Sequence, residues 1–281
     1  MADESGLEWL LGLDYGPLTE RVDKQALARF QADRSALEVS LPASQRTIDS
    51  DEWRDRLRLE NFASANRLDY ARRADDQLYA EVDFPSEGDA DVWVLDIIST
   101  PDRRVAVGST KSFGRFSHGY GILVKFVAID LGHEVPPLKL IPRARENRDA
   151  AGMLERHFTF DGAQWSPVDG VPDWMTRQNP SPEPKAGWLK RVREAGKQSK
   201  SLAEQNAAGA AQQASAWFGD GVGEQIVQHA AGFHLEFVEN KVVIHRKVSG
   251  PRELTKPESL RELFGIAVAL GPALAEATAA Q

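Results

Sequence analysis

The densest mixture of reactive side chains in this sequence lies between residues 109 and 121. This segment combines hydroxyls, cations, glycines and aromatic rings without an acidic residue, and its candidate ligand-binding residues are Lys111, Arg115, His118 and Tyr120. The two cations could clamp a phosphate through charge-assisted hydrogen bonds, and the rings could stack on a base or a peptide side chain. A polar loop between two strands has the same composition. The segment therefore has two interpretations. It is either a functional site, which binds a phosphate ligand or catalyses hydrolysis, or an ordinary polar connection between two strands.

Three of the six histidines, His229, His234 and His245, lie near one another in the sequence. If His234 and His245 face each other across a hairpin, they could bind zinc together with Glu236, because imidazole and carboxylate groups are common zinc ligands. No His-Glu-x-x-His spacing accompanies them, and the alternative places both rings on the solvent face of the hairpin. We expect no metal.

The other familiar signatures of catalysis are missing from the sequence. The glycines of Gly219–Gly223 superficially resemble a phosphate loop, but they lack the Lys and Ser/Thr of that motif, so we expect a flexible helix entry there. No Gly-x-Ser-x-Gly elbow is present, and the absence of cysteine excludes thiolate catalysis, disulfides and Cys-ligated zinc. We expect no cofactor, and whether the protein is an enzyme stays open.

A basic stretch between residues 185 and 200 surrounds Trp188, and its candidate partner-binding residues are Trp188, Lys190, Arg191 and Arg193. It could contact a protein partner, lie on an anionic membrane, or form a solvated helix face. The whole chain carries a net charge of -8, with a pI near 5.4. This acidity argues against nucleic acid as the main partner, because phosphate binding relies on clustered Lys and Arg.

The hydrophobic periodicity predicts an α+β protein with N-terminal helices, a mostly antiparallel sheet and a C-terminal helix-hairpin-helix unit. We expect helices over 18–36, 50–68, 220–231 and 257–279, strands over 77–84, 92–98, 104–108, 122–131, 138–141 and 157–160, and a hairpin over 233–248. The proline-rich run 179–184 predicts a joint, and the Ala/Gln-rich stretch 202–216 has helix propensity but few apolar anchors. We thus expect residues 1–178, an exposed segment 179–216, and residues 217–281 that form a second unit or complete the same core.

The sequence also bears on compartment. Residues 1–5 are acidic where a signal peptide would be basic, and the longest apolar tract, 264–275, is far shorter than the roughly 20 residues of a membrane span. We expect a cytoplasmic protein that lacks a membrane span.

Three segments carry a resemblance to known sequences. Trp53–Tyr70, the turn Val135–Leu138 and the strand His157–Phe160 resemble parts of a loosely defined group of uncharacterised actinobacterial domain-of-unknown-function proteins. Members of this group are often membrane-anchored, whereas we expect no anchor here. The resemblance implies a similar fold and brings no active site with it.

These observations predict a non-catalytic cytoplasmic interaction or adaptor protein. It would bind a protein partner through the sheet region and the exposed segment 180–216, because an exposed insertion accompanies an absence of recognisable chemistry. Two alternatives stay open: a hydrolase or phosphate-ligand enzyme that uses the 111–120 loop, and a peripheral membrane-surface protein that uses the basic stretch. The oligomeric state stays open as well.

Overall fold

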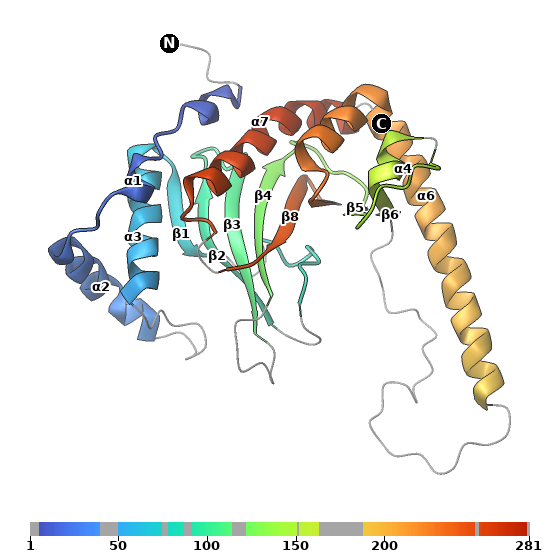
Figure 1. The fold of residues 1–281 in the computed structure, drawn as a ribbon, viewed down its shortest axis with the longest axis horizontal. Helices are drawn as coiled ribbons and strands as arrows, with labels where there is room; N and C mark the ends of the chain where they lie inside the picture. The colour runs from blue at the N-terminus through green and yellow to red at the C-terminus, as the bar shows by residue number, and fades with distance from the viewer. Residues whose placement is uncertain are drawn as a thin grey trace.

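A single antiparallel sheet of eight strands forms the centre of the protein (Figure 1). The computed structural model describes residues 6–39, 50–74, 78–86, 91–113, 122–150, 152–162, 188–250 and 253–279. The spatial order of the strands is β1-β2-β3-β4-β8-β7-β5-β6. Their bounds are β1 Asp69–Arg73, β2 Asp91–Ser99, β3 Val105–Phe113, β4 Leu123–Asp130, β5 Leu138–Pro142, β6 Phe158–Asp161, β7 His234–Val238 and β8 Lys241–Val248. The expected α+β class and antiparallel sheet are confirmed.

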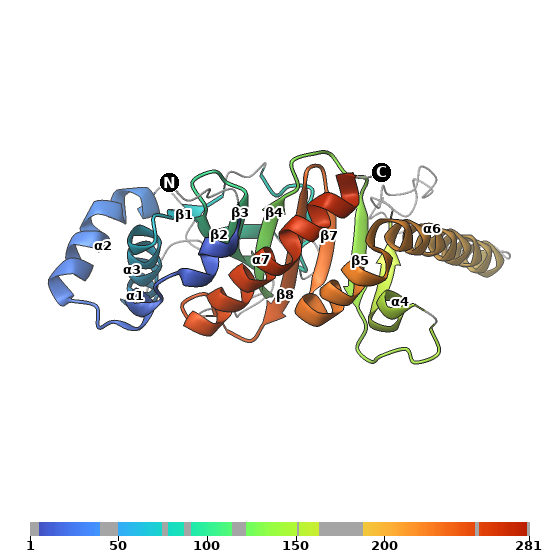
Figure 2. The same cartoon turned by 90° about the horizontal axis from the view of Figure 1, so that it is seen from above.

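The helices lie along one face of this sheet and at its two ends (Figures 1 and 2). They are η1 Glu8–Gly12, α1 Gly16–Thr19, α2 Lys24–Val39, α3 Ser50–Ala65, α4 Met153–His157, α6 Trp188–Ala230 and α7 Pro257–Ala279. The α2–α3 pair flanks the β1 end, α7 crosses the middle of the sheet, and α6 lies at the β6 end. We call the side covered by α7 the helix face and the opposite side the strap face.

The C-terminal hairpin is central in the sheet, although it comes late in the sequence. β8 pairs with β4, and β7 pairs with β5, so the hairpin joins the two groups of earlier strands. One buried hydrophobic cluster runs from Leu7 to Leu274. The described residues on both sides of the proline-rich run therefore share one sheet and one core.

The strap face is covered in part by residues 78–86, which we call the strap. Tyr79, Val82 and Phe84 of the strap are buried against Phe126 and its neighbours on β4. The sequence prediction of a strand over 77–84 is wrong, because these buried positions recur at intervals of three and two, and most of the strap is turn and irregular chain. The strap contributes side chains to the core without joining the ladder.

Other differences from the predicted elements have local causes. The helix expected over 18–36 is interrupted, since α1 ends at Thr19 and α2 begins at Lys24. The edge strand β1 was not predicted, because its sequence Asp-Tyr-Ala-Arg-Arg is mostly charged and lacks apolar alternation. Charged edge strands are common in natural sheets, where they discourage edge-to-edge association.

The second half of α6 belongs to the core, contrary to the expected exposure of the chain through residue 216. Ala210 and Ala214 are 2% and 0% exposed. Their small side chains permit close packing on the end of β6, where a Cβ added to Gly162 would lie 3.2 Å from the Ala210 Cβ. At Gly219 the backbone leaves helical geometry, with φ 48°, so α6 consists of two helices that meet at a kink.

The helix α7 is long and apolar enough to cross a membrane by length and composition, and it is the one described helix that meets this test. Its buried positions, which include Leu263, Phe264 and Leu270, belong to the central hydrophobic cluster. This packing is typical of the core helix of a folded domain.

Candidate functional site

The structure places the sequence-predicted ligand residues only in part. Lys111 lies in β3, level with Trp93 of β2 and Leu123 of β4, and this register puts it on the helix face. Arg115, His118 and Tyr120 lie outside the described residues. A site in the 111–120 loop therefore stays a prediction.

The sequence-predicted partner residues are at the beginning of α6. Trp188, Lys190, Arg191 and Arg193 belong to its first turns, and their side chains lie outside the described part of the molecule. In Figures 1 and 2 this half of α6 runs away from the sheet and from the other labelled elements. From Trp188 onward the basic stretch is therefore helical and projects from the body.

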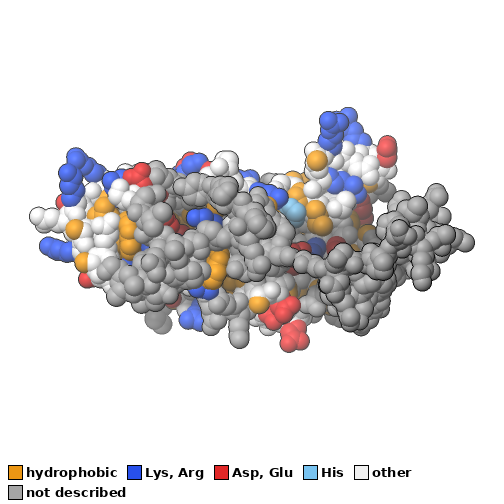
Figure 3. All heavy atoms as spheres, turned by 90° about the horizontal axis from the view of Figure 1, so that it is seen from below, with side chains coloured by type: hydrophobic (Ala, Val, Ile, Leu, Met, Phe, Trp, Pro, Cys, Tyr) orange, Lys and Arg blue, Asp and Glu red, His pale blue; other side chains and the backbone are white. Residues whose placement is uncertain are grey.

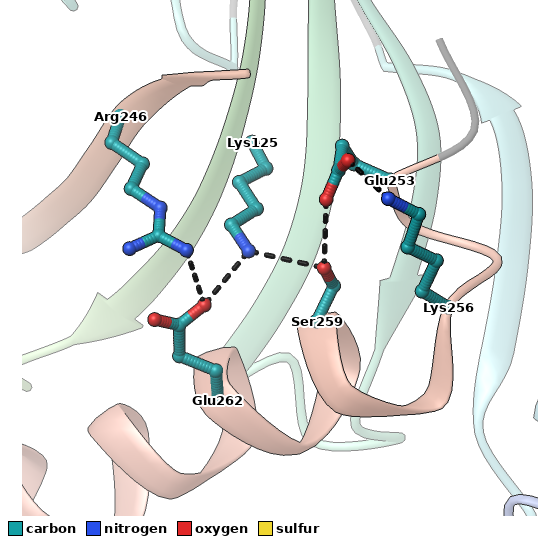
Figure 4. Close-up of polar contacts among 6 residues, drawn as sticks. All are labelled: Lys125, Arg246, Glu253, Lys256, Ser259 and Glu262. Atoms are coloured by element: carbon teal, nitrogen blue, oxygen red, sulfur yellow. Dashed lines mark hydrogen bonds and ion pairs between the residues drawn. The ribbon is translucent and has the colours of Figure 1, made fainter. Parts of the chain in front are cut away.

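Sequence reasoning missed a buried polar cluster on the helix face (Figure 4). Lys125 of β4 is 1% exposed, and its Nζ donates to Ser259 Oγ at 3.1 Å and to Glu262 Oε2 at 2.7 Å. Arg246 of β8, which lies opposite Lys125 in the register, donates to the same carboxylate oxygen at 2.8 Å. The Ser259 hydroxyl donates in turn to Glu253 Oε2 at 3.2 Å. These contacts fix the first turns of α7 to the centre of the sheet.

A serine beside a lysine can act as a nucleophile and base, but this pair is not arranged for that reaction. Ser259 is in the first turn of α7, faces Lys125 of the sheet and is only 3% exposed. The Lys125 Nζ donates to both Ser259 Oγ and Glu262, so it is a donor to the hydroxyl and not the acceptor of its proton that a base would be. The cluster is therefore structural.

A second polar cluster lies on the strap face, where β5, β7 and β8 meet the strap. Glu236 of β7 is 4% exposed and accepts hydrogen bonds from the backbone N–H of Asp83, at 3.2 and 3.1 Å. Lys139 of β5 lies opposite Glu236 in the register and contacts its carboxylate at 3.2 Å and that of Asp83 at 3.1 Å. These groups hold the strap onto the sheet.

Burial and charge act in opposite directions on this pair. Burial raises the pKa of Glu236, and the Lys139 ammonium only partly offsets that effect. Burial alone would lower the pKa of Lys139, but the carboxylates of Glu236 and Asp83 outweigh it and raise that pKa. The two shifts agree with the exposures, since the Glu236 side chain is 6% exposed and that of Lys139 is 24% exposed.

The histidines His234 and His245 face each other across the β7–β8 ladder beside this cluster. Their rings are stacked, with centroids 5.0 Å apart and planes at 13°. His245 is 2% exposed, so the expectation that it lies on the solvent face is wrong. The ring of the strap residue Phe84 packs against it edge-on, with the two ring centroids 5.4 Å apart. Burial first, then the charges of His234 and Lys139, lower the pKa of His245 to about 3, and its Nδ1 has no hydrogen-bond partner among the described residues.

Among the described residues, no three His, Asp or Glu side chains come together in an arrangement that could hold a metal ion. The facing histidines pack ring on ring, and the nearby Glu236 carboxylate is engaged by Asp83 and Lys139 instead. The described geometry thus favours a packed imidazole pair.

Comparison with known proteins finds no match to a protein-family model, a curated protein or a solved structure.

Proposed function

We propose that this protein is a non-catalytic cytoplasmic adaptor that binds a protein partner through residues 188–209, the first half of α6, which we call the arm. The course of α6 carries this proposal. From Ala210 onward the helix is packed in the core, whereas the arm runs away from the sheet in both ribbon views (Figures 1 and 2). At about 1.5 Å per residue, the arm is roughly 30 Å long.

A helix that extends from a folded body gains little from tertiary packing. Most of the stability of helices in proteins comes from the packing of an amphipathic face, so contact with a partner would stabilise the arm. In its sequence Trp188, Val192 and Ala195 recur at the spacing of one helix face, with lysine and arginine among residues 190–193. Such a pattern suits an apolar groove with an acidic rim, as in helix-in-groove recognition.

The part of the fold to which the arm is attached supports the same role. We take the second half of α6, the hairpin β7–β8 and α7 as one helix-hairpin-helix unit, in which α6 packs against α7 and the hairpin lies in the middle of the sheet. This unit would hold the arm at a fixed position on a rigid body. Partner binding would then cost little conformational entropy beyond that lost when the arm itself becomes ordered.

The two described polar clusters favour binding over catalysis. Lys125 is engaged by Ser259 and Glu262, and Lys139 by Asp83 and Glu236. Each cluster fixes one element of the fold to the sheet, α7 in one case and the strap in the other. Neither leaves an activated nucleophile at the surface.

The test is a charge reversal in the arm with a matched reversal elsewhere. The arm variant is K190E/R191E/R193E, and the control is R21E/K24E/R29E, which changes the charge equally at three exposed positions near and in α2. A photo-crosslinking residue at position 199, compared with one at position 25, would first capture the partner in cells. Deletion of the whole stretch 180–216 is a poorer test, because it removes Ala210 and Ala214 from the core.

The expected result is a protein that crosslinks at position 199 and binds the purified parent chain directly. Its affinity should fall at least tenfold with the arm variant and stay unchanged with the α2 control. Equal binding by both variants would refute the proposal. If the arm variant instead loses salt-sensitive binding to phosphatidylglycerol vesicles and no protein is captured, the membrane-surface alternative replaces it.

A further inference from the structure

A hollow of about 430 Å³ opens on the strap face beside the polar cluster, between the strap and strands β5, β7 and β8. This volume is within the range of about 300–1,000 Å³ that is typical of small-molecule sites. Part of its lining is apolar, and part carries charged and imidazole groups. The apolar part includes Phe84, Pro85 and Ile141, and the polar part includes Asp83, Lys139, His234, Glu236 and Lys247. Figure 3 shows the strap face, on whose described parts apolar, basic and acidic side chains are interspersed.

The charges around the hollow are unevenly satisfied. Lys139 contacts the carboxylates of both Glu236 and Asp83, so two acidic groups face one ammonium in this part of the hollow. Lys247, an exposed residue of β8, has no ion pair within the described part of the chain. Its ammonium group acts on His234, since burial first and then the charge of Lys247 lower the pKa of that imidazole. The hollow therefore has one basic corner without a counter-ion among the described groups.

We infer that this hollow is a binding site for a small organic carboxylate. Lys247 and the His234 imidazole bind the anionic end, while the side chains of Phe84, Pro85 and Ile141 contact the apolar body. A ligand of this kind matches both parts of the lining, because the apolar side chains exclude water and Lys247 gains a charge-assisted hydrogen bond. Inorganic anions would use only the basic corner.

The neighbouring groups set the expected pH dependence. His234 faces Lys247 and Lys139, which disfavour its protonation, and Asp83, which favours it, and its ring is stacked on His245. A bound carboxylate would offset the effect of Lys247, so the pKa of His234 should rise when the ligand binds. Affinity should then increase as the pH falls through that pKa.

The test uses benzoate, acetate and inorganic phosphate on the full chain. Calorimetric titration should give at least tenfold tighter binding for benzoate than for acetate or phosphate, and the side-chain NMR signals of His234 should shift with a raised pKa. Lys247→Gln should weaken benzoate binding about tenfold, whereas Lys24→Gln, at an exposed lysine of α2, should leave it unchanged. Both lysines are exposed, so neither change is expected to alter folding.

The inference is overturned if benzoate leaves the His234 signals unchanged, or if Lys247→Gln and Lys24→Gln bind benzoate equally. It is also overturned if acetate and phosphate bind as well as benzoate, because the apolar part of the lining would then play no part. These outcomes do not depend on the arm. The adaptor proposal can therefore fail while the carboxylate site is supported, and the carboxylate site can fail while the adaptor proposal is supported.

Discussion

Removing the charge of Glu262 should destabilise the protein far more than removing that of Lys125. The two partners differ in exposure, since the Lys125 side chain is 2% exposed and that of Glu262 is 34% exposed. In Glu262→Gln the buried ammonium loses its carboxylate and keeps Ser259 Oγ as its described neutral acceptor. In Lys125→Met the carboxylate keeps Arg246 and its access to water.

The size of the destabilisation expected for Glu262→Gln follows from the geometry around Glu262 Oε2. The Lys125 and Arg246 nitrogens contact this atom at 2.7 and 2.8 Å, so they lie at most 5.5 Å apart. Without the anion, their repulsion is about 3 kcal/mol at an effective dielectric constant of about 20. We expect Glu262→Gln to cost about 3–5 kcal/mol, the usual range for leaving a buried charge uncompensated. Lys125→Met should lie within about 1 kcal/mol of the parent, because methionine fills a similar volume without a charge.

The assay is urea unfolding at pH 7, read as the midpoint at unchanged slope. Glu258→Gln is the matched control, since this exposed residue lies in the first turn of the same helix and should cost only a few tenths of a kcal/mol. The double variant Lys125→Met/Glu262→Gln should recover most of the loss of Glu262→Gln. If Lys125→Met costs as much as Glu262→Gln, or if the double variant is worse than either, the asymmetry argued from exposure is wrong.

Two further predictions concern the strap face and the sheet beneath it. Between pH 6.5 and about 3 the unfolded chain binds a proton that native His245 does not, so the unfolding equilibrium constant should rise up to tenfold per pH unit on acidification. The measurement is the unfolding free energy, obtained from urea midpoints at several pH values, in the parent and in His245→Phe. The dependence of this free energy on pH should be weaker in the variant by the uptake of one proton. An equal dependence in both proteins would contradict the burial argument. Gly108→Ala should cost about 1–3 kcal/mol, because its Cβ would lie 2.7 Å from the fully buried ring of Phe126. Thermal melts can compare it with Gly209→Ala, where the Cβ meets nothing and helix propensity should raise stability.

The elements of the fold were predictable where the apolar pattern is regular. β4 is buried at six consecutive positions, as its continuous apolar run suggests, the buried residues of β5 alternate, and α7 has the expected bounds. The strap was misread as a strand because its bulky residues alternate in part, while its lack of a partner strand is a tertiary property. Ala210 and Ala214 were misread as exposed because small residues carry no burial signal of their own until a neighbouring element approaches closely.

The polar clusters show why the site was harder to predict than the sheet. Lys125 is recognisable in sequence as a lone charge inside an apolar strand, and such a charge requires a partner. The sequence does not identify that partner, since Glu262 is 137 residues away. Asp83 and Glu236 are separated by 153 residues. Contacts between polar residues so far apart in the sequence depend on the order of the strands in the sheet, and local hydrophobic periodicity does not reveal that order.

The strand order also explains why the proline-rich run does not divide the protein into two independent parts. β7 and β8 follow that run in sequence, yet they lie between β4 and β5, which precede it. Without the hairpin, β4 and β5 would each lose a neighbouring strand, and Lys125 and Lys139 would lose Arg246 and Glu236 from their surroundings. The hollow on the strap face and the buried ion cluster therefore both depend on one late hairpin, because its insertion brings their residues onto a common sheet.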